Sequence, residues 1–140
     1  MATMRSGLAT VFLLTFASVT HAEPAGLWRE RDGGTIRVYE CDPGYCAEIV
    51  SVVPTTDPKT GAPATDRRNP DPTKRTRPLV GVSILTDTKP DGPNRWAGRL
   101  YDCDHGRTFP GRLVEVDEMT IRLEGCAGSI CGGEELTRVK

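Results

Sequence analysis

This sequence of 140 residues has few histidines and few aromatic residues, and neither positive nor negative charge is in large excess. It has 2 histidines, 6% aromatic residues, and 18 Lys+Arg against 19 Asp+Glu. Proteins that bind nucleic acids carry a strong basic excess to neutralise phosphates, so the near-neutral charge excludes that class of partner. One histidine, His21, lies in the N-terminal segment. A zinc site built on several imidazoles is therefore excluded within one chain.

The sequence also has no apolar run long enough to cross a membrane as a helix. Its longest, Leu8 to Val19, is shorter than the roughly 20 residues that a spanning helix needs. Arg5 precedes this run and Thr20-His21-Ala22 follows it, which is the pattern of a secretory signal peptide over residues 1–22. We expect one domain over 23–140, periplasmic or secreted, without a membrane anchor; a retained anchor is the alternative.

Five cysteines are present, and the expected compartment allows them to form disulfides. Cys41 and Cys46 flank a turn sequence, Asp42-Pro43-Gly44-Tyr45, and Cys126 and Cys131 flank a similar one. Residues facing each other across a hairpin lie within the distance that a disulfide accepts. The spacing predicts Cys41 with Cys46, Cys126 with Cys131, and a free Cys103. The alternatives are a site of four thiolates for zinc and a Cys103 paired between chains.

Helical periodicity is rare, whereas short β-rich runs separated by turn residues recur along the chain. Eight such strands joined by tight turns predict an antiparallel meander, and closing it into a barrel removes its exposed edges. The fold class is therefore all-β, a small eight-stranded barrel. The expected strands are Gly26–Glu30, Thr35–Glu40, Cys46–Val53, Leu79–Leu85, Arg95–Tyr101, Arg107–Val116, Met119–Glu124 and Glu134–Val139.

One connection is long: residues 54–78 hold six of the eleven prolines and carry more basic than acidic side chains. Such loops are either functional or disordered, and we expect this one to lie ordered across one end of the barrel. Its arginines are candidate contacts for an anionic ligand. Alternatively, Arg77 pairs with Asp66 or Asp71 to order the loop. The candidate ligand or loop residues are Asp66, Arg67, Arg68, Asn69, Asp71 and Arg77.

Short motifs spread over the whole mature chain form a specific combination. They are Gly26-Leu27-Trp28, Cys41 and Cys46, Asp66-x-x-Asn69-Pro70-Asp71, Arg77-Pro78-Leu79-x-Gly81, Asn94-Arg95-Trp96-x-Gly98, Tyr101-Asp102, Gly106 with Thr108, and Leu136-Thr137-Arg138. This combination resembles the proteobacterial secreted domain of unknown function 2147. The sequence departs from that pattern at Cys103, where proline is common, and at Glu135-Leu136, where an aromatic residue usually precedes Thr-Arg. The resemblance implies no activity.

A second resemblance is to lipocalin-like barrels, which carry Gly-x-Trp in the first strand and an arginine in the last. In that superfamily the tryptophan closes one end of the barrel and the arginine stacks over it, a cation–π contact of roughly 1 to 2 kcal/mol when shielded. The resemblance gives these places to Trp28 and Arg138.

These observations predict a binding protein without catalytic residues, cofactor or metal. An eight-stranded barrel is filled by side chains or holds one small ligand, and short strands argue against a large lipid cavity. Gly81, Ser83 and Gly98 either leave room inside or mark bends or close strand packing. The reactive cluster Asp102-Cys103-Asp104-His105 is interpreted as a polar turn. We expect a small anionic or amphipathic organic ligand at the barrel mouth beneath 54–78; the alternative is an envelope protein-interaction or inhibitor-like module that presents this loop.

Overall fold

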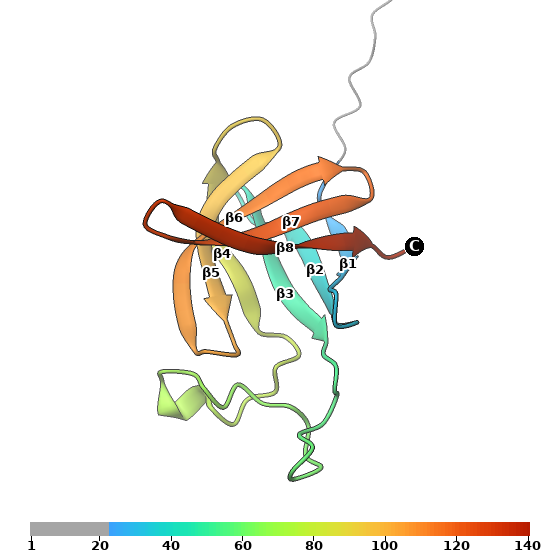
Figure 1. The fold of residues 1–140 in the computed structure, drawn as a ribbon, viewed down its shortest axis with the longest axis vertical. Coiled ribbons are helices and arrows are strands. Elements are labelled where there is room, and N and C mark those ends of the chain that lie inside the picture. Colours follow the sequence, from blue (N-terminus) through green and yellow to red (C-terminus); the bar gives the residue numbers. More distant parts are fainter. Residues whose placement is uncertain (1–22) are drawn as a thin grey trace, which may run out of the picture.

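The computed structural model describes residues 23–140, so the predicted signal peptide over 1–22 lies outside the described residues. Eight strands wind into a closed barrel, with one long connection projecting from its lower end (Figure 1). The strands are β1 (Gly26–Arg29), β2 (Thr35–Glu40), β3 (Tyr45–Ser51), β4 (Ser83–Pro90), β5 (Arg95–Asp102), β6 (Arg107–Asp117), β7 (Thr120–Ala127) and β8 (Ile130–Arg138). The all-β prediction is confirmed.

Each strand pairs antiparallel with its neighbour in sequence, and β1 pairs with β8 to close the barrel. The alternation of apolar and polar residues explains this arrangement, since every second side chain of a strand points inward. On β7, for example, Ile121 and Leu123 are buried between outward-facing polar residues. The largest fully buried core side chains are Trp28, Ile36, Leu85, Leu113, Ile121 and Leu136.

The expected fourth strand, Leu79–Leu85, was wrong by several residues. Val82 N–H donates to the Leu79 carbonyl at 3.0 Å, and Gly81 has φ +90°, so this segment turns before β4 begins at Ser83. Val80 is consequently exposed although the alternation predicted that it would share a face with Val82. An apolar residue at every second position does not distinguish a strand from an extended turn that carries alternating valines.

The last hairpin is longer than predicted. The seventh strand was expected to end at Glu124 and the eighth to begin at Glu134, but β7 and β8 continue to a tight turn, with Cys126 opposite Cys131. The structure joins these two cysteines, and also Cys41 and Cys46, as disulfides. Cys103 carries a free thiol. Strand β1 ends one residue before the predicted Glu30, and β3 ends at Ser51 rather than Val53.

Trp28 and Arg138 close one end of the barrel. The Trp28 ring is fully buried, its indole N–H donates to the Pro24 carbonyl at 2.8 Å, and the Arg138 guanidinium lies 4.2 Å from the ring centroid. Arg138 also donates to the carbonyls of Glu23, Ala25 and Glu118. Trp28 and Arg138 therefore occupy the positions that the lipocalin-like resemblance implies. Because they close this end of the barrel, an opening to the interior can lie only at the opposite end.

Four glycines lie in one row across β5 to β8: Gly98, Gly111, Gly125 and Gly132 are successive partners in the register. A Cβ on Gly98 would approach the Thr86 carbonyl oxygen to 2.4 Å, so this glycine allows close strand packing rather than leaving room. A Cβ on Gly132 would meet nothing within 4 Å. Of these two, only Gly132 on β8 therefore leaves open space beside it.

The loop over residues 54–78 is ordered against the barrel. It contains a short 3-10 turn, η1 (Pro72–Lys74), and two isolated β-bridges, Thr56 with Pro63 and Thr65 with Pro78. Within residues 23–140, no helix is long and apolar enough to span a membrane.

Candidate functional site

A cavity of about 1130 Å³ opens at the loop end of the barrel, opposite Trp28. Its floor is apolar and comes from the inward faces of five strands. The floor residues are Ile49, Ile84, Leu100, Phe109 and Leu123. The cavity extends outward between the strand ends and loop residues such as Pro54 and Pro58, which is why it is larger than the short strands predict.

The rim of the cavity is polar and charged. It is formed by the β1–β2 turn, the loop, the β5–β6 turn and the inward side of β8. The ionisable rim residues are Glu30, Asp32, Asp57, Arg67, Arg68, Asp102, Asp104, His105 and Glu134. An apolar floor beneath a charged rim suits a molecule with an apolar body and a polar group.

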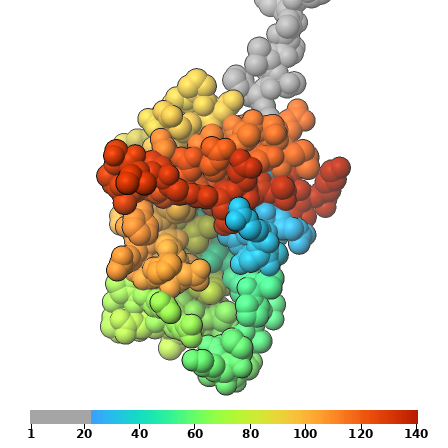
Figure 2. All heavy atoms as spheres, viewed as in Figure 1, coloured from blue at the N-terminus to red at the C-terminus, as the bar shows by residue number. Residues whose placement is uncertain are grey.

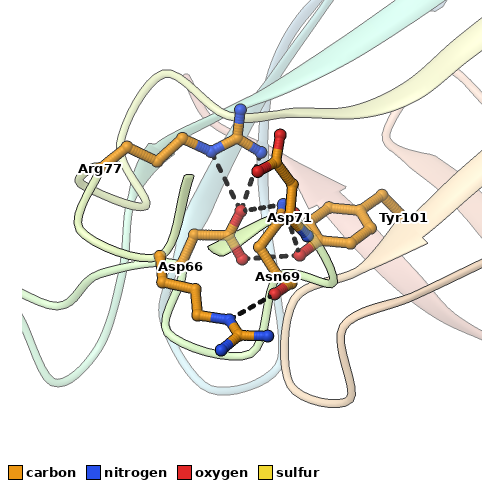
Figure 3. Close-up of polar contacts among 6 residues, drawn as sticks. Asp66, Asn69, Asp71, Arg77 and Tyr101 are labelled. Atoms are coloured by element: carbon orange, nitrogen blue, oxygen red, sulfur yellow. Dashed lines mark hydrogen bonds and ion pairs between the residues drawn. The ribbon is translucent and has the colours of Figure 1, made fainter. Parts of the chain in front are cut away.

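Asp66 holds the loop on the barrel wall (Figure 3). Its carboxylate is fully buried and accepts hydrogen bonds from the Tyr101 hydroxyl at 2.6 Å, from the Asn69 amide at 2.8 Å and from Arg77 Nε and Nη2 at 3.0 and 2.8 Å. Tyr101 belongs to β5, whereas the other three residues belong to the loop. We call this cluster, Asp66, Asn69, Arg77 and Tyr101, the polar latch.

Electrostatics keep the Asp66 carboxylate of the polar latch ionised. Burial alone raises the pKa of Asp66, but the hydrogen bonds from Tyr101 and Asn69 and the Arg77 guanidinium outweigh it and hold the pKa below its usual value. The same burial and the bond to Asp66 raise the pKa of the Tyr101 hydroxyl. The charged pair and its donors therefore satisfy one another at neutral pH.

A second contact brings the loop against the β5–β6 turn. The Arg68 carbonyl oxygen approaches Gly106 so closely that a Cβ there would lie 1.8 Å from it, and Gly106 has φ +63°. Figure 2 shows the green loop segment packed against the orange end of the β5–β6 hairpin. Glycine is the residue that permits both this backbone conformation and this approach.

Comparison with known proteins identifies the family. The profile of a bacterial family, described as "Uncharacterized protein conserved in bacteria (DUF2147)", matches residues 26–138. The chain belongs to the DUF2147 family. A solved structure described as "Protein HP1028 from the human pathogen Helicobacter pylori belongs to the lipocalin family" is similar to this DUF2147 barrel, with a TM-score of 0.70. The two are 19% identical, and the similarity covers 85% of this chain and 84% of that one. No curated protein matches the sequence.

The candidate ligand or loop residues of this DUF2147 protein lie in three different places. Asp66, Asn69 and Arg77 form the polar latch, so Arg77 pairs with Asp66 and its bonded nitrogens face that carboxylate. Asp71 instead caps η1, accepting from Thr73 N at 3.0 Å. Arg67 and Arg68 line the cavity, and Arg67 contacts Asp57 at 3.4 Å.

The Asp102-Cys103-Asp104-His105 segment of the DUF2147 chain forms a turn at the rim. His105 Nδ1 lies 2.7 Å from Asp102 Oδ2, so the imidazole pairs with a carboxylate. Burial, with the negative charges of Asp66, Asp104 and Asp102, raises the pKa of the Cys103 thiol to about 12. A thiol with so high a pKa stays protonated at neutral pH and is a weak nucleophile.

Glu30, Asp104 and Glu134 were not recognised as site residues from the DUF2147 sequence. The alternation of inward and outward side chains could have indicated two of them. Glu30 is two residues after the buried Trp28, and Glu134 is two residues before the buried Leu136. Both therefore point toward the inside of the barrel. Burial and the charges of Glu134, Asp32 and Asp104 raise the pKa of Glu30 to about 7.

The raised pKa of Glu30 gives the DUF2147 barrel a specific pH dependence. The folded protein keeps a proton on Glu30 that the unfolded chain releases above its ordinary pKa, so this stabilisation is present at low pH and is lost as the pH rises through about 7. In Glu30→Gln, we expect a smaller decline in the free energy of unfolding between about pH 5 and about pH 8. Urea denaturation at several pH values measures this.

The exposed Glu118, in the β6–β7 turn away from the mouth, supplies the matched control. Glu118→Gln should keep the decline of the parent protein. An unchanged pH profile in Glu30→Gln would show that Glu30 does not titrate in this range.

Proposed function

We propose that this protein binds a small, partly apolar organic molecule in the cavity at the barrel mouth, and that it does so in the periplasm or outside the cell. The observation that carries the proposal is a cavity of about 1130 Å³ with an apolar floor inside a closed barrel. Small-molecule sites in proteins have volumes of roughly 300 to 1,000 Å³ and predominantly apolar walls. Eight-stranded barrels are wide enough to hold one such ligand.

The ordered loop supports this proposal. Its polar latch and the Arg68–Gly106 contact hold one wall of the cavity in place, so the site does not have to be assembled when a ligand arrives. A preformed site loses less conformational entropy on binding than a flexible one. The two disulfides are consistent with an oxidising compartment.

Filling the cavity should abolish binding without unfolding the barrel. Gly132 lines the cavity, and a Cβ there would meet nothing within 4 Å, so Gly132→Phe places an aromatic ring in open space at the mouth. We expect at least a tenfold loss of affinity for an apolar fluorescent probe such as N-phenyl-1-naphthylamine, which is roughly 1.4 kcal/mol. Probe fluorescence gives the affinity, and circular dichroism checks the fold.

Thr137→Phe is the matched control, because Thr137 is an exposed residue of the same strand outside the cavity lining. It should bind the probe as the parent does. Equal probe binding by Gly132→Phe and the parent would contradict the proposed cavity site, as would failure of the parent to bind any apolar probe or to carry a molecule when isolated gently from its compartment.

We further propose that the protein has no catalytic role. The protonated Cys103 thiol and the pairing of His105 with Asp102 support this proposal. A Cys103→Ser variant that folds but loses an activity detected in the parent would overturn it. The alternative function, an envelope protein-interaction or inhibitor-like module using 54–78, stays a prediction, tested by whether a partner binds the parent and not a variant with an altered loop.

A further inference from the structure

The mouth of the cavity carries more negative than positive charge, although the loop by itself is basic. Six carboxylates lie at the rim, against the two arginines Arg67 and Arg68 and the single imidazole of His105. Low-dielectric walls concentrate such a field and attract ligands of the opposite sign. The preference for an anion, which the loop arginines predicted, does not follow from the rim as a whole.

The rim carboxylates fall into two groups. Asp32, Asp57 and Asp102 accept hydrogen bonds from backbone N–H groups of their own turns. Within residues 23–140, no donor hydrogen-bonds the carboxylates of Glu30, Asp104 or Glu134, and none of them forms an ion pair there. The carboxylates of the first group stabilise the turns in which they lie, and those of the second group are available to bind a ligand.

The second group converges on the cavity from three different elements. Glu30 directly follows β1, Glu134 lies on β8, and Asp104 lies in the β5–β6 turn. Strands β1 and β8 are paired, with Trp28 opposite Arg138, so Glu30, just after β1, and Glu134, on β8, lie on the inward side of neighbouring segments. Glu134, Asp32 and Asp104 are close enough to Glu30 that their charges, added to burial, raise its pKa to about 7. These carboxylates therefore repel one another in the absence of a cation.

The arginines are placed differently. Arg67 contacts Asp57 within the loop, and Arg68 is in the segment whose carbonyl packs on Gly106. Both belong to the loop wall of the cavity, whereas Glu30 and Glu134 belong to the barrel wall formed by β1 and β8. Glu134 is the register partner of the apolar floor residue Leu123, so the barrel wall offers a carboxylate beside the floor.

We propose that the cavity takes an amphipathic molecule with a positively charged nitrogen, which lies among Glu30, Asp104 and Glu134 while its apolar part covers Leu100 and Leu123. This inference rests on the proposed function, since it names the ligand class of the same cavity. A cation there relieves the mutual repulsion of the carboxylates, whereas an anion adds to it. Charge pairs near a protein surface are stronger than in bulk water because the effective dielectric constant is lower.

The test uses three probes with one apolar chain and different head groups: decyltrimethylammonium, decanol and decanoate. Titration calorimetry with the mature protein, below the micelle-forming concentration, gives the three affinities. We expect the cation to bind roughly tenfold tighter than the alcohol, and the anion to bind weakest. The cation should also bind tighter at about pH 8 than at about pH 5, because Glu30 ionises between them.

The triple variant Glu30→Gln, Asp104→Asn, Glu134→Gln should bind decanol as the parent does and should lose the preference for the cation and most of its pH dependence. Glu118→Gln, away from the mouth, should keep both. Equal or tighter binding of decanoate, or a cation preference that survives in the triple variant, overturns the ligand class but leaves the cavity site intact. If the parent protein binds none of the three probes, the proposed function fails, and the ligand class fails with it.

Discussion

Asp66→Ala is expected to lower the free energy of unfolding by roughly 2 to 6 kcal/mol, because it leaves two donors without the buried carboxylate that accepts from them. The Asp66 carboxylate is fully buried and accepts bonds from Tyr101, Asn69 and Arg77. Its loss leaves the donors of Tyr101 and Asn69 without their acceptor, at a desolvation cost of about 1 to 3 kcal/mol each. Urea denaturation followed by circular dichroism measures the change.

The same substitution should release the loop from the barrel. Hydrogen exchange should become faster at the backbone amides of Asn69 and Leu79, which donate to carbonyls within the loop. Glu48→Ala is the control, because it removes one partner of an exposed pair with Arg37, where an ion pair is worth at most about 1 kcal/mol. A loss in Asp66→Ala no larger than in this control would mean that the polar latch does not hold the loop.

The polar latch also predicts a loss of stability in acid. Because the pKa of Asp66 is lowered in the folded state, its contribution is present above the ordinary carboxyl pKa and disappears as the pH falls through the lower folded value. This direction is opposite to that of Glu30, whose contribution disappears as the pH rises through about 7. Asp66 therefore lowers the free energy of unfolding when the pH falls into the acid range, whereas Glu30 lowers it when the pH rises toward 7.

Trp28→Ala is expected to cost roughly 3 to 5 kcal/mol, the range for deleting a large buried aromatic side chain. The ring is fully buried at the closed end of the barrel, and its removal leaves a cavity beneath Arg138. It also removes the N–H that bonds the Pro24 carbonyl and the face over which the Arg138 guanidinium stacks. Thermal and urea denaturation should both show the loss.

Leu27→Ala is the matched control for Trp28→Ala. Leu27 is the neighbouring residue on β1, points to the other face of the strand and is 38% exposed, so its removal should cost less than about 1 kcal/mol. If the two variants lost similar stability, Trp28 would not be the residue that closes the barrel.

Local patterns in the sequence were sufficient for the architecture. Alternating apolar residues predicted eight strands, and the turns between them predicted an antiparallel meander. The pairs Cys41–Cys46 and Cys126–Cys131 could be predicted because each pair flanks one turn, and hairpin geometry then brings the two ends together. The position of β4 could not, because Val80 and Val82 alternate in the same way whether the chain pairs or turns at Gly81.

The candidate site was only partly predictable. Asp66 and Arg77 are near each other in the sequence, and their pairing within the loop was among the predicted alternatives, whereas the bond from Asn69 to Asp66 was not predicted. Tyr101 could not be assigned to them, because it comes from β5 and meets Asp66 only after the loop folds back over the barrel wall. The anionic ligand was predicted from the charge of the loop alone, which does not include the carboxylates that other elements add to the mouth.

The sequence by itself determined most of the strands, the turns between them and the two disulfide pairs, because each depends on neighbours within a few positions of the chain. The roles of Trp28 and Arg138 at the closed end came from the resemblance to lipocalin-like barrels. Only the tertiary structure decided which side chains share the mouth. Glu30, Asp104 and Glu134 are far apart in the sequence, and they meet because closure of the sheet pairs β1 with β8 and brings the β5–β6 turn to the same rim. The register and tilt of a closed barrel are set by all eight strands together, so no single segment contains that information.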